Sequence, residues 1–388
     1  MTGAVTGLAG GPLRGVARAL RRERSGVLPG VAAPMARPPE PRLEMLDVRR
    51  SLRSPESAGD PVLALVLQRA AAGTRPGARR DPHRLYLAVE GGGMRGAVTA
   101  GMGVVLEAAG LTDAFDRIYG VSAGALNGGA LAAGQAALAA TLYEDVASQH
   151  VINRMRPLVR QPLIDFDVLF DELIVARKPL SSEGLAGGPE FRALAVSLQT
   201  LTLRVLSGFA DAGEVMQAIR ASAFLPRLGG GAPQFRDEPM TDGAVLEPIP
   251  YESAVAEGAT HVLVLRSRPA DYRAPRLRAI ADSLVVRGEP ALATLVRRSR
   301  DVYARQAAEL AGRGAAHRPR ALISQIAVPE GTPLIGRLEA SAERAVEAIR
   351  VGGGAMARAV LTEPVDLCWQ PTVYRRADAE EGAMRGGG

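Results

Sequence analysis

The chain has 388 residues, 47% of them hydrophobic and 23% charged, a globular composition with room for one large domain or two modest ones. Its formal net charge of +6 comes almost entirely from arginine, a bias typical of genome composition, so we expect no nucleic-acid partner; the charge is compatible with an anionic membrane surface. One cysteine, Cys368, excludes an internal disulfide framework and a cysteine-rich metal site, and the four histidines show no metal-ligand spacing.

The first 80 residues are poorly patterned, and we expect an N-terminal extension that is partly disordered. Within it, apolar spacing over residues 61–72 predicts one amphipathic helix. Residues 13–24 fit either a basic helix on a membrane surface or a solvated tail. The N-terminus lacks the charge order of a signal peptide, and no stretch has the length and hydrophobicity of a transmembrane helix. We therefore expect a cytoplasmic protein, with peripheral membrane contact as the alternative.

Predicted strands and helices alternate over residues 81–365, which indicates one folded domain followed by a C-terminal tail over residues 366–388. The expected strands cover residues 85–90, 117–121, 260–267 and 321–327, with a two-stranded hairpin over 191–206. The expected helices cover residues 97–109, 123–133, 138–149, 213–223, 291–311 and 341–361, the last interrupted by glycines at 352–354. This alternation predicts an α/β fold with a mainly parallel sheet covered on both faces.

The first strand ends in a glycine-rich loop that reads GGGMRG over residues 91–96. Three consecutive glycines let the backbone approach a bound anion closely, and the free N–H groups of the following helix point the same way. Such donors stabilise a negatively charged oxygen. The letters also fit a dinucleotide-binding loop, but that site needs an acidic residue at the end of the second strand, which ends in Gly120-Val121-Ser122 instead.

The second strand leads into GVSAG over residues 120–124, the pattern of a nucleophile elbow. A serine at a sharp strand-to-helix turn is held in a strained conformation that raises its hydroxyl above the sheet. Only glycine fits cheaply two residues before and two after it, at Gly120 and Gly124. The flanking strand and helix favour Ser122 as a nucleophile over an incidental serine in a glycine-rich turn.

A serine nucleophile needs a general base, and the sequence offers two kinds. The usual hydrolase order places a histidine after the serine, but His261 opens an apolar run typical of a strand, and His317 lies in a polar segment. Asp242 is the better candidate, because it precedes Gly243 and Ala244 after a turn-rich stretch and can be held at a loop tip. A turn aspartate bonded to its own backbone is the alternative.

These three motifs together resemble the patatin-like phospholipase family, over about residues 84–269. The loop at 91–96 is similar to the family's oxyanion-hole motif, the stretch at 120–124 to its elbow, and residues 242–244 to its Asp-Gly-Ala/Gly motif. Residues 221–226 and 247–250 also look like bacterial members. Glu90 departs from plant members, which typically carry aspartate there, but glutamate is familiar in bacterial ones.

The resemblance implies a three-layer α/β/α patatin-like fold, with Ser122 as nucleophile, Asp242 as general base and no catalytic histidine. It implies an oxyanion hole in the glycine-rich loop, with backbone N–H groups of Gly92, Gly93 and Arg95 as donors. The expected hole residues are Gly91, Gly92, Gly93, Arg95 and Gly96, and the remaining motif residues are Gly120, Gly124, Gly243 and Ala244.

The implied function is a serine lipid acyl hydrolase, similar to a phospholipase A, that cleaves carboxylic esters through an acyl-enzyme and needs no metal or organic cofactor. Its partner would be a lipid or another acyl ester; the oligomeric state is left open. Two alternatives remain: a hydrolase of thioesters or soluble esters with the same dyad, and a non-catalytic nucleotide-binding protein. The apolar residues over 151–180 form either part of an acyl-chain pocket or lid, or an ordinary packed helix.

Overall fold

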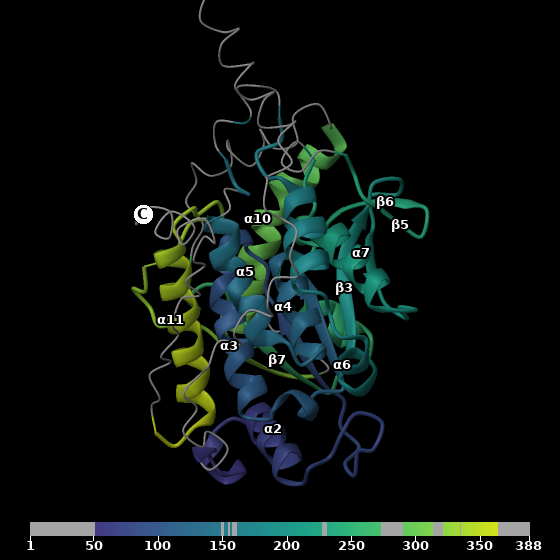
Figure 1. Ribbon diagram of the computed structural model, residues 1–388. Helices are drawn as coiled ribbons and strands as arrows, with labels where there is room; N and C mark the ends of the chain where they lie inside the picture. Colours follow the sequence, from purple (N-terminus) through teal and green to yellow (C-terminus); the bar gives the residue numbers. More distant parts are fainter. Residues whose placement is uncertain are drawn as a thin grey trace, which may run out of the picture.

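The computed structural model describes residues 51–148, 151–153, 156, 161–226, 231–272, 290–312, 321–333 and 335–363. Within these ranges the chain folds around one central sheet (Figure 1). Its strands are β1 (Leu85–Val89), β2 (Arg117–Val121), β3 (Glu190–Ser197), β4 (Leu203–Leu206), β5 (Gln234–Phe235), β6 (Glu238–Asp242), β7 (His261–Leu265) and β8 (Leu322–Ile326).

The sheet is mainly parallel, as the sequence predicts. Its strands lie in the order β5-β6-β3-β2-β1-β7-β8, and β4 pairs with β3. The five strands from β3 to β8 in this order run parallel, whereas the pairs β3–β4, β3–β6 and β5–β6 are antiparallel. The expected hairpin is therefore confirmed as β3 and β4. β1 lies near the middle, where Ala88 pairs with Tyr119 on one side and Val264 on the other.

Helices cover both faces of the sheet (Figure 1). They are α2 (Pro61–Ala71), α3 (Gly96–Ala108), α4 (Ala123–Ala132), α5 (Ala136–Ser148), α6 (Ser182–Gly187), α7 (Ala212–Ala223), α8 (Tyr251–Ala256), α10 (Pro290–Leu310) and α11 (Ala342–Val360). Short 3-10 helices include η2 (Pro55–Ala58), η3 (Gly93–Arg95), η4 (Thr112–Ala114) and η7 (Gly243–Val245), and η6 (Val168–Arg177) is a π-helix.

Alternate side chains of β1 enter two separate hydrophobic cores. Leu85, Leu87 and Val89 pack with α3, α4, α5, α7 and α11, whereas Tyr86 and Ala88 pack with α8 and α10. Successive residues of a strand point to opposite faces, so a strand that is apolar throughout must be covered on both. The three-layer α/β/α architecture is thereby confirmed.

α11 lies along α3 (Figure 1), and the two helices meet at glycines. A Cβ at Gly101 would fall on the carbonyl oxygen of Ile349, and one at Gly352 on the carbonyl oxygen of Val98. Backbones can approach this closely only where no side chain intervenes. α11 runs unbroken from Ala342 to Val360, so the expected interruption at residues 352–354 is wrong: these glycines allow the helix crossing and do not end the helix.

α2 confirms the helix expected over residues 61–72 and joins the main hydrophobic core. The Asp60 carboxylate caps it by accepting the N–H groups of Val62 and Leu63, each at 2.9 Å. Near its end, Arg69 is only 1% exposed and donates to Asp81 at 2.7 Å and to Asp116 at 2.9 Å. These bonds tie the segment before β1 to the start of the sheet.

The basic segment at residues 13–24 and the tail at residues 366–388 lie outside the described residues. The domain boundaries placed at residues 80 and 365 stay predictions. Among the described helices, none has both the length and the apolar character that crossing a membrane requires.

Candidate active site

The three predicted motifs meet at the edge of the sheet where the parallel strands end. The glycine-rich loop follows β1, Ser122 follows β2, and Asp242 is the last residue of β6. β3 joins the last two, because Leu194 pairs with β2 and Ala195 pairs with Asp242. Ligands of open α/β sheets bind at this edge, so the topology brings the candidate residues together where chemistry is expected.

Ser122 has the backbone geometry of a nucleophile elbow, with φ of 57° and ψ of −129°. This left-handed φ is strained for serine and persists only where the surroundings impose it. A Cβ at Gly120 would lie 2.5 Å from the Cα of Ala125, and one at Gly124 would lie 2.8 Å from the carbonyl oxygen of Glu90. The close passage of chain on both sides of the turn explains why glycine occupies these two positions.

Ser222 holds the elbow in place, although it belongs to none of the three motifs. Its hydroxyl oxygen accepts the N–H of Ser122 at 2.9 Å, and its hydroxyl donates to the carbonyl oxygen of Leu194 at 2.6 Å. The side chain is fully buried. Ser222 therefore links the turn to β3, and the only available signal was its place in the family-like stretch at residues 221–226.

The Asp242 carboxylate lies close enough to the Ser122 hydroxyl for this hydroxyl to lower its pKa. Asp242 and Ser122 are 6% and 8% exposed, respectively. Burial raises the pKa of Asp242 to about 6, against the opposing effects of the Ala244 N–H at 2.8 Å, the Ser122 hydroxyl and the charge of Arg337. Such a carboxylate is ionised at neutral pH and is a stronger base than an ordinary aspartate.

Close packing against β3 explains why a glycine, Gly243, follows the candidate base. A Cβ there would lie 2.6 Å from the carbonyl carbon of Leu194 and closer still to its oxygen. The bond from the Ala244 N–H to Asp242 Oδ1 is a local turn contact, as the alternative interpretation of this aspartate expected. Both features occur together: the turn holds the carboxylate, and the held carboxylate reaches Ser122.

The glycine-rich loop packs directly against the elbow. A Cβ at Gly91 would lie 2.9 Å from the Cβ of Ser122, and one at Gly96 would lie 2.7 Å from the Cβ of Ala123. Gly93 has a φ of 60°, in the left-handed region that favours glycine. The loop thus passes the nucleophile at a distance that larger residues would not permit.

The loop's backbone donors are not equivalent. Within the described part of the chain, no hydrogen bond engages the N–H groups of Gly92 and Gly93, which leaves both available to an oxyanion. The Arg95 N–H donates to the carbonyl oxygen of Gly92 at 3.4 Å, and the Met94 N–H donates to the carbonyl oxygen of Arg337 at 3.0 Å. Gly92 and Gly93 are therefore the better-placed donors of the predicted hole.

The backbone at Arg337 lies over the same loop. A Cβ at Gly93 would come within 2.6 Å of the carbonyl oxygen of Arg337, and the charge of this arginine also acts on Asp242. Arg337 lies far beyond the stretch that resembles the family, between β8 and α11. Sequence motifs gave no indication of its position beside the site.

His261 lies at the opposite edge of the sheet, because it begins β7, whereas the site follows the ends of β1 and β2. Its Nδ1 is hydrogen-bonded to Thr260 Oγ1 at 2.9 Å, and its ring meets that of His83 edge-on, with 4.6 Å between centroids. Burial lowers the pKa of His261. These contacts fit a structural role. His317 lies outside the described residues.

Three aromatic rings of the predicted apolar segment and its neighbourhood lie beside the candidate base. Phe166 stacks with Phe170 at 5.6 Å between centroids and meets Phe224 edge-on at 5.8 Å. The carbonyl oxygen of Phe224 accepts the N–H of Asp242 at 2.7 Å. A buried aromatic cluster is therefore joined through one backbone hydrogen bond to the residue that carries the carboxylate.

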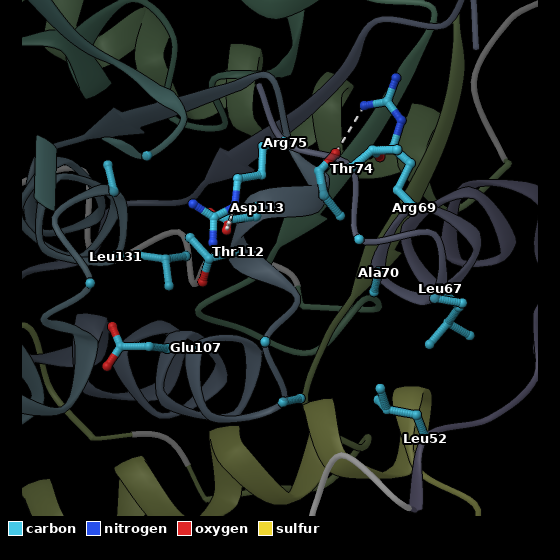
Figure 2. A pocket seen from close by; sticks show the side chains of 18 of the residues that line it. Leu52, Leu67, Arg69, Ala70, Thr74, Arg75, Glu107, Thr112, Asp113 and Leu131 are labelled. Carbon is cyan, nitrogen blue, oxygen red and sulfur yellow. Dashed lines mark hydrogen bonds and ion pairs between the residues drawn. The ribbon is translucent and has the colours of Figure 1, made fainter. Parts of the chain in front are cut away.

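A separate cavity of about 840 Å³, shown in Figure 2, is lined by none of the candidate catalytic residues. It is lined by the C-terminal ends of α2, α3 and α4 and by α6, with Arg69, Glu107, Thr112 and Asp113 among its residues (Figure 2). α3 and α4 begin at the loop and the elbow and run back across the sheet, so the cavity opens at the other edge. Within the described ranges, no cluster of three or more His, Cys, Asp or Glu side chains could hold a metal ion.

Comparison with known families matches residues 87–255 to the patatin-like phospholipase family. The matched residues include the loop, the elbow and Asp242. This match supports a lipid acyl hydrolase in general, an esterase- or lipase-type enzyme.

Among solved structures, the crystal structure of VipD from Legionella pneumophila is similar over 72% of this chain and 67% of that one, with 13% identity and a TM-score of 0.37. So remote a likeness says nothing about substrate or mechanism. Comparison with curated proteins finds no significant match.

Proposed function

We propose that the chain is a serine lipid acyl hydrolase of the phospholipase A type, which cleaves carboxylic esters with a dyad of Ser122 and Asp242. The placement of the Ser122 hydroxyl beside the buried Asp242 carboxylate carries the proposal. A nucleophile and a base in direct contact are the minimum that acyl transfer requires.

The first half-reaction forms an acyl-enzyme. Ser122 Oγ attacks the ester carbonyl carbon while Asp242 accepts the hydroxyl proton. The N–H groups of Gly92 and Gly93 stabilise the negative charge on the tetrahedral carbonyl oxygen. Asp242 then gives its proton to the leaving alcohol as the bond between the carbonyl carbon and the alcohol oxygen breaks.

The second half-reaction repeats these roles with water. Asp242 takes a proton from a water molecule that attacks the acyl carbon, and the same donors hold the second oxyanion. The proton returns to Ser122 Oγ as the acyl bond breaks, which releases the carboxylic acid. Every proton is carried by Asp242, so no metal or cofactor enters the cycle.

The apolar surroundings of Asp242 support an acyl chain as the group that the site accepts. Phe166, Phe170 and Phe224 form a cluster whose last member is bonded through its backbone to Asp242. An alkyl chain that leaves water for apolar surroundings gains about 0.8 kcal/mol for each buried CH₂ group. A fatty acyl ester would thus be preferred over an acetyl ester.

Labelling with an alkyl fluorophosphonate tests the nucleophile. Wild-type protein should be modified at Ser122, as mapped by mass spectrometry of the peptide, and Ser122→Ala should not be labelled. Ser253→Ala is a matched control, because Ser253 is another buried serine whose hydroxyl bonds a buried carboxylate, that of Glu247 at 2.5 Å. Labelling of Ser122→Ala at the wild-type rate would contradict the proposal and reopen a nucleotide-binding role for the glycine loop.

A substrate panel then separates the ester classes. Phospholipid, a water-soluble short-chain ester and an acyl thioester should all depend on Ser122, because each reacts at an acyl carbon. We expect the highest kcat/KM with the phospholipid. A clear preference for the thioester or the soluble ester would redefine the substrate while leaving the dyad intact.

A further inference from the structure

A buried ionic cluster lies directly behind the glycine-rich loop. Glu90 Oε2 accepts the Nε–H of Arg266 and the backbone N–H of Ser267, each at 2.9 Å. Arg266 also donates to Tyr303 at 2.8 Å, and Arg268 stacks over the ring of Tyr303 at 4.2 Å. Glu90 is 1% exposed, Arg266 and Ser267 are fully buried, and Arg268 is 6% exposed. None of these groups takes part in the proton transfers described above.

The charges of the cluster do not cancel. Burial alone would raise the pKa of Glu90, but Arg266 and Arg268 hold it below its usual range, so the carboxylate is ionised. Both guanidinium groups stay protonated. Two cations against one anion leave a net charge of +1. Burying charged groups costs desolvation free energy, so a buried ion pair is by itself weak evidence of stability. What matters is the group that the cluster holds in place.

Ser267 connects the cluster to the loop. Its Oγ donates to the carbonyl oxygen of Gly91 at 2.9 Å, while its own N–H is held by Glu90. A Cβ at Gly92 would lie 3.1 Å from Ser267 Oγ, so the hydroxyl lies against both glycines. One side chain thus joins the buried carboxylate to the peptide unit between Gly91 and Gly92.

That peptide unit is the important one for catalysis. The carbonyl of Gly91 and the N–H of Gly92 belong to one planar trans peptide and point in opposite directions. When Ser267 fixes the carbonyl of Gly91, it also fixes the direction of the Gly92 N–H, away from Ser267. Gly91 in turn lies against Ser122, which sets the distance from this donor to the nucleophile.

We propose that Glu90 and Ser267 are positioning residues for the oxyanion hole, acting through the peptide between Gly91 and Gly92, with Arg266 and Arg268 keeping Glu90 ionised. The inference rests on the proposed function, because it assigns a role in the same reaction. It also gives a physical reason for an acidic residue directly before the glycines: the carboxylate is an acceptor for Ser267, not a ligand for substrate.

Ser267→Ala tests the proposal with little change in shape. We expect kcat for a short ester to fall about tenfold, because the hydrogen bond that orients the peptide unit is lost. KM should stay within about twofold. A trifluoromethyl ketone adds to the Ser122 hydroxyl and forms an anionic tetrahedral adduct, so its Ki should rise by the same factor as kcat falls. Rates are expressed per site titrated with fluorophosphonate, which removes any effect of unfolded protein.

Two further variants distinguish lost orientation of the loop peptide from lost packing of the side chain. Ser267→Cys keeps the shape of the side chain, with a slightly larger atom, but donates only weakly, so it should lose activity much as Ser267→Ala does. Ser253→Ala removes the hydroxyl of another buried serine, one that donates to Glu247 away from the loop, and should keep wild-type kcat and Ki. Wild-type kcat and Ki in both Ser267 variants would overturn the positioning role while leaving the dyad in place. Absence of labelling in the wild type would instead contradict the proposed function itself.

Discussion

Replacing Asp242 with asparagine should inactivate the protein and stabilise it at neutral pH. Asparagine keeps the shape of the side chain and can accept the Ala244 N–H, but it cannot take the proton of Ser122. Burial raises the pKa of Asp242 from 3.8 to about 6 in the folded state. The charged form is therefore less favourable in the folded protein than in the unfolded chain, and the substitution removes that charge.

The size and sign of the effect follow from this shift. Below pH of about 4 the carboxyl is neutral in both states and contributes no penalty. As the pH rises through the unfolded and then the folded pKa of Asp242, stability is lost, and above pH of about 6 the loss is complete. A shift of roughly two units at 1.36 kcal/mol each amounts to about 3 kcal/mol at neutral pH.

Urea denaturation of the wild type and of Asp242→Asn, at neutral pH and near pH of about 4, measures the difference in their free energies of unfolding. We expect the variant to be more stable by a few kcal/mol near neutral pH and nearly equal to the wild type near pH of about 4. Ser122→Ala is the matched control, because it removes the nucleophile but keeps the buried charge. An Asp242→Asn protein that is no more stable than the wild type at neutral pH would refute the reasoning about desolvation.

Three other outcomes are expected. Gly93→Ala should lower kcat by about 10²–10³, because a methyl group would meet the carbonyl oxygen of Arg337 and displace a hole donor; kcat per titrated site measures this. Gly352→Ala should lower the free energy of unfolding by about 1–3 kcal/mol through a clash with Val98, whereas Gly354→Ala, which meets only the flexible end of a side chain, should not. Hydrolysis should rise when phospholipid passes from monomers to vesicles, and anionic lipid should help at low salt but not at high salt; equal rates on monomers and vesicles would favour a soluble ester.

The parts of the site that could be predicted from the sequence are those where one backbone segment passes close to another. Gly120, Gly124 and Gly243 each lie where a Cβ would collide with main-chain atoms, so the motifs record a steric requirement that is local in sequence. The same is true of the left-handed Gly93. The strands and helices around these turns could also be predicted, because the apolar runs between the glycines fit few other structures.

The rest depended on contacts between distant segments. Ser222 supports the elbow across 100 residues, and Ser267 reaches the loop across 176. A single serine carries no pattern, so neither role could be predicted. The glycines at 352–354 were misinterpreted because a glycine run in isolation predicts a break, whereas here Gly352 meets Val98 across a helix crossing. Arg337 reaches the site from a segment without motifs.

Hydrolysis of one ester by three purified variants tests the dyad most directly. Asp242→Asn should lose most of its kcat/KM, while His261→Gln and His317→Gln should retain substantial turnover. In the wild type, kcat/KM should rise with pH through the pKa of Asp242, near 6, because the ionised carboxylate is the active base. A histidine variant that folds normally yet loses as much activity as Asp242→Asn would contradict the dyad and favour a histidine triad.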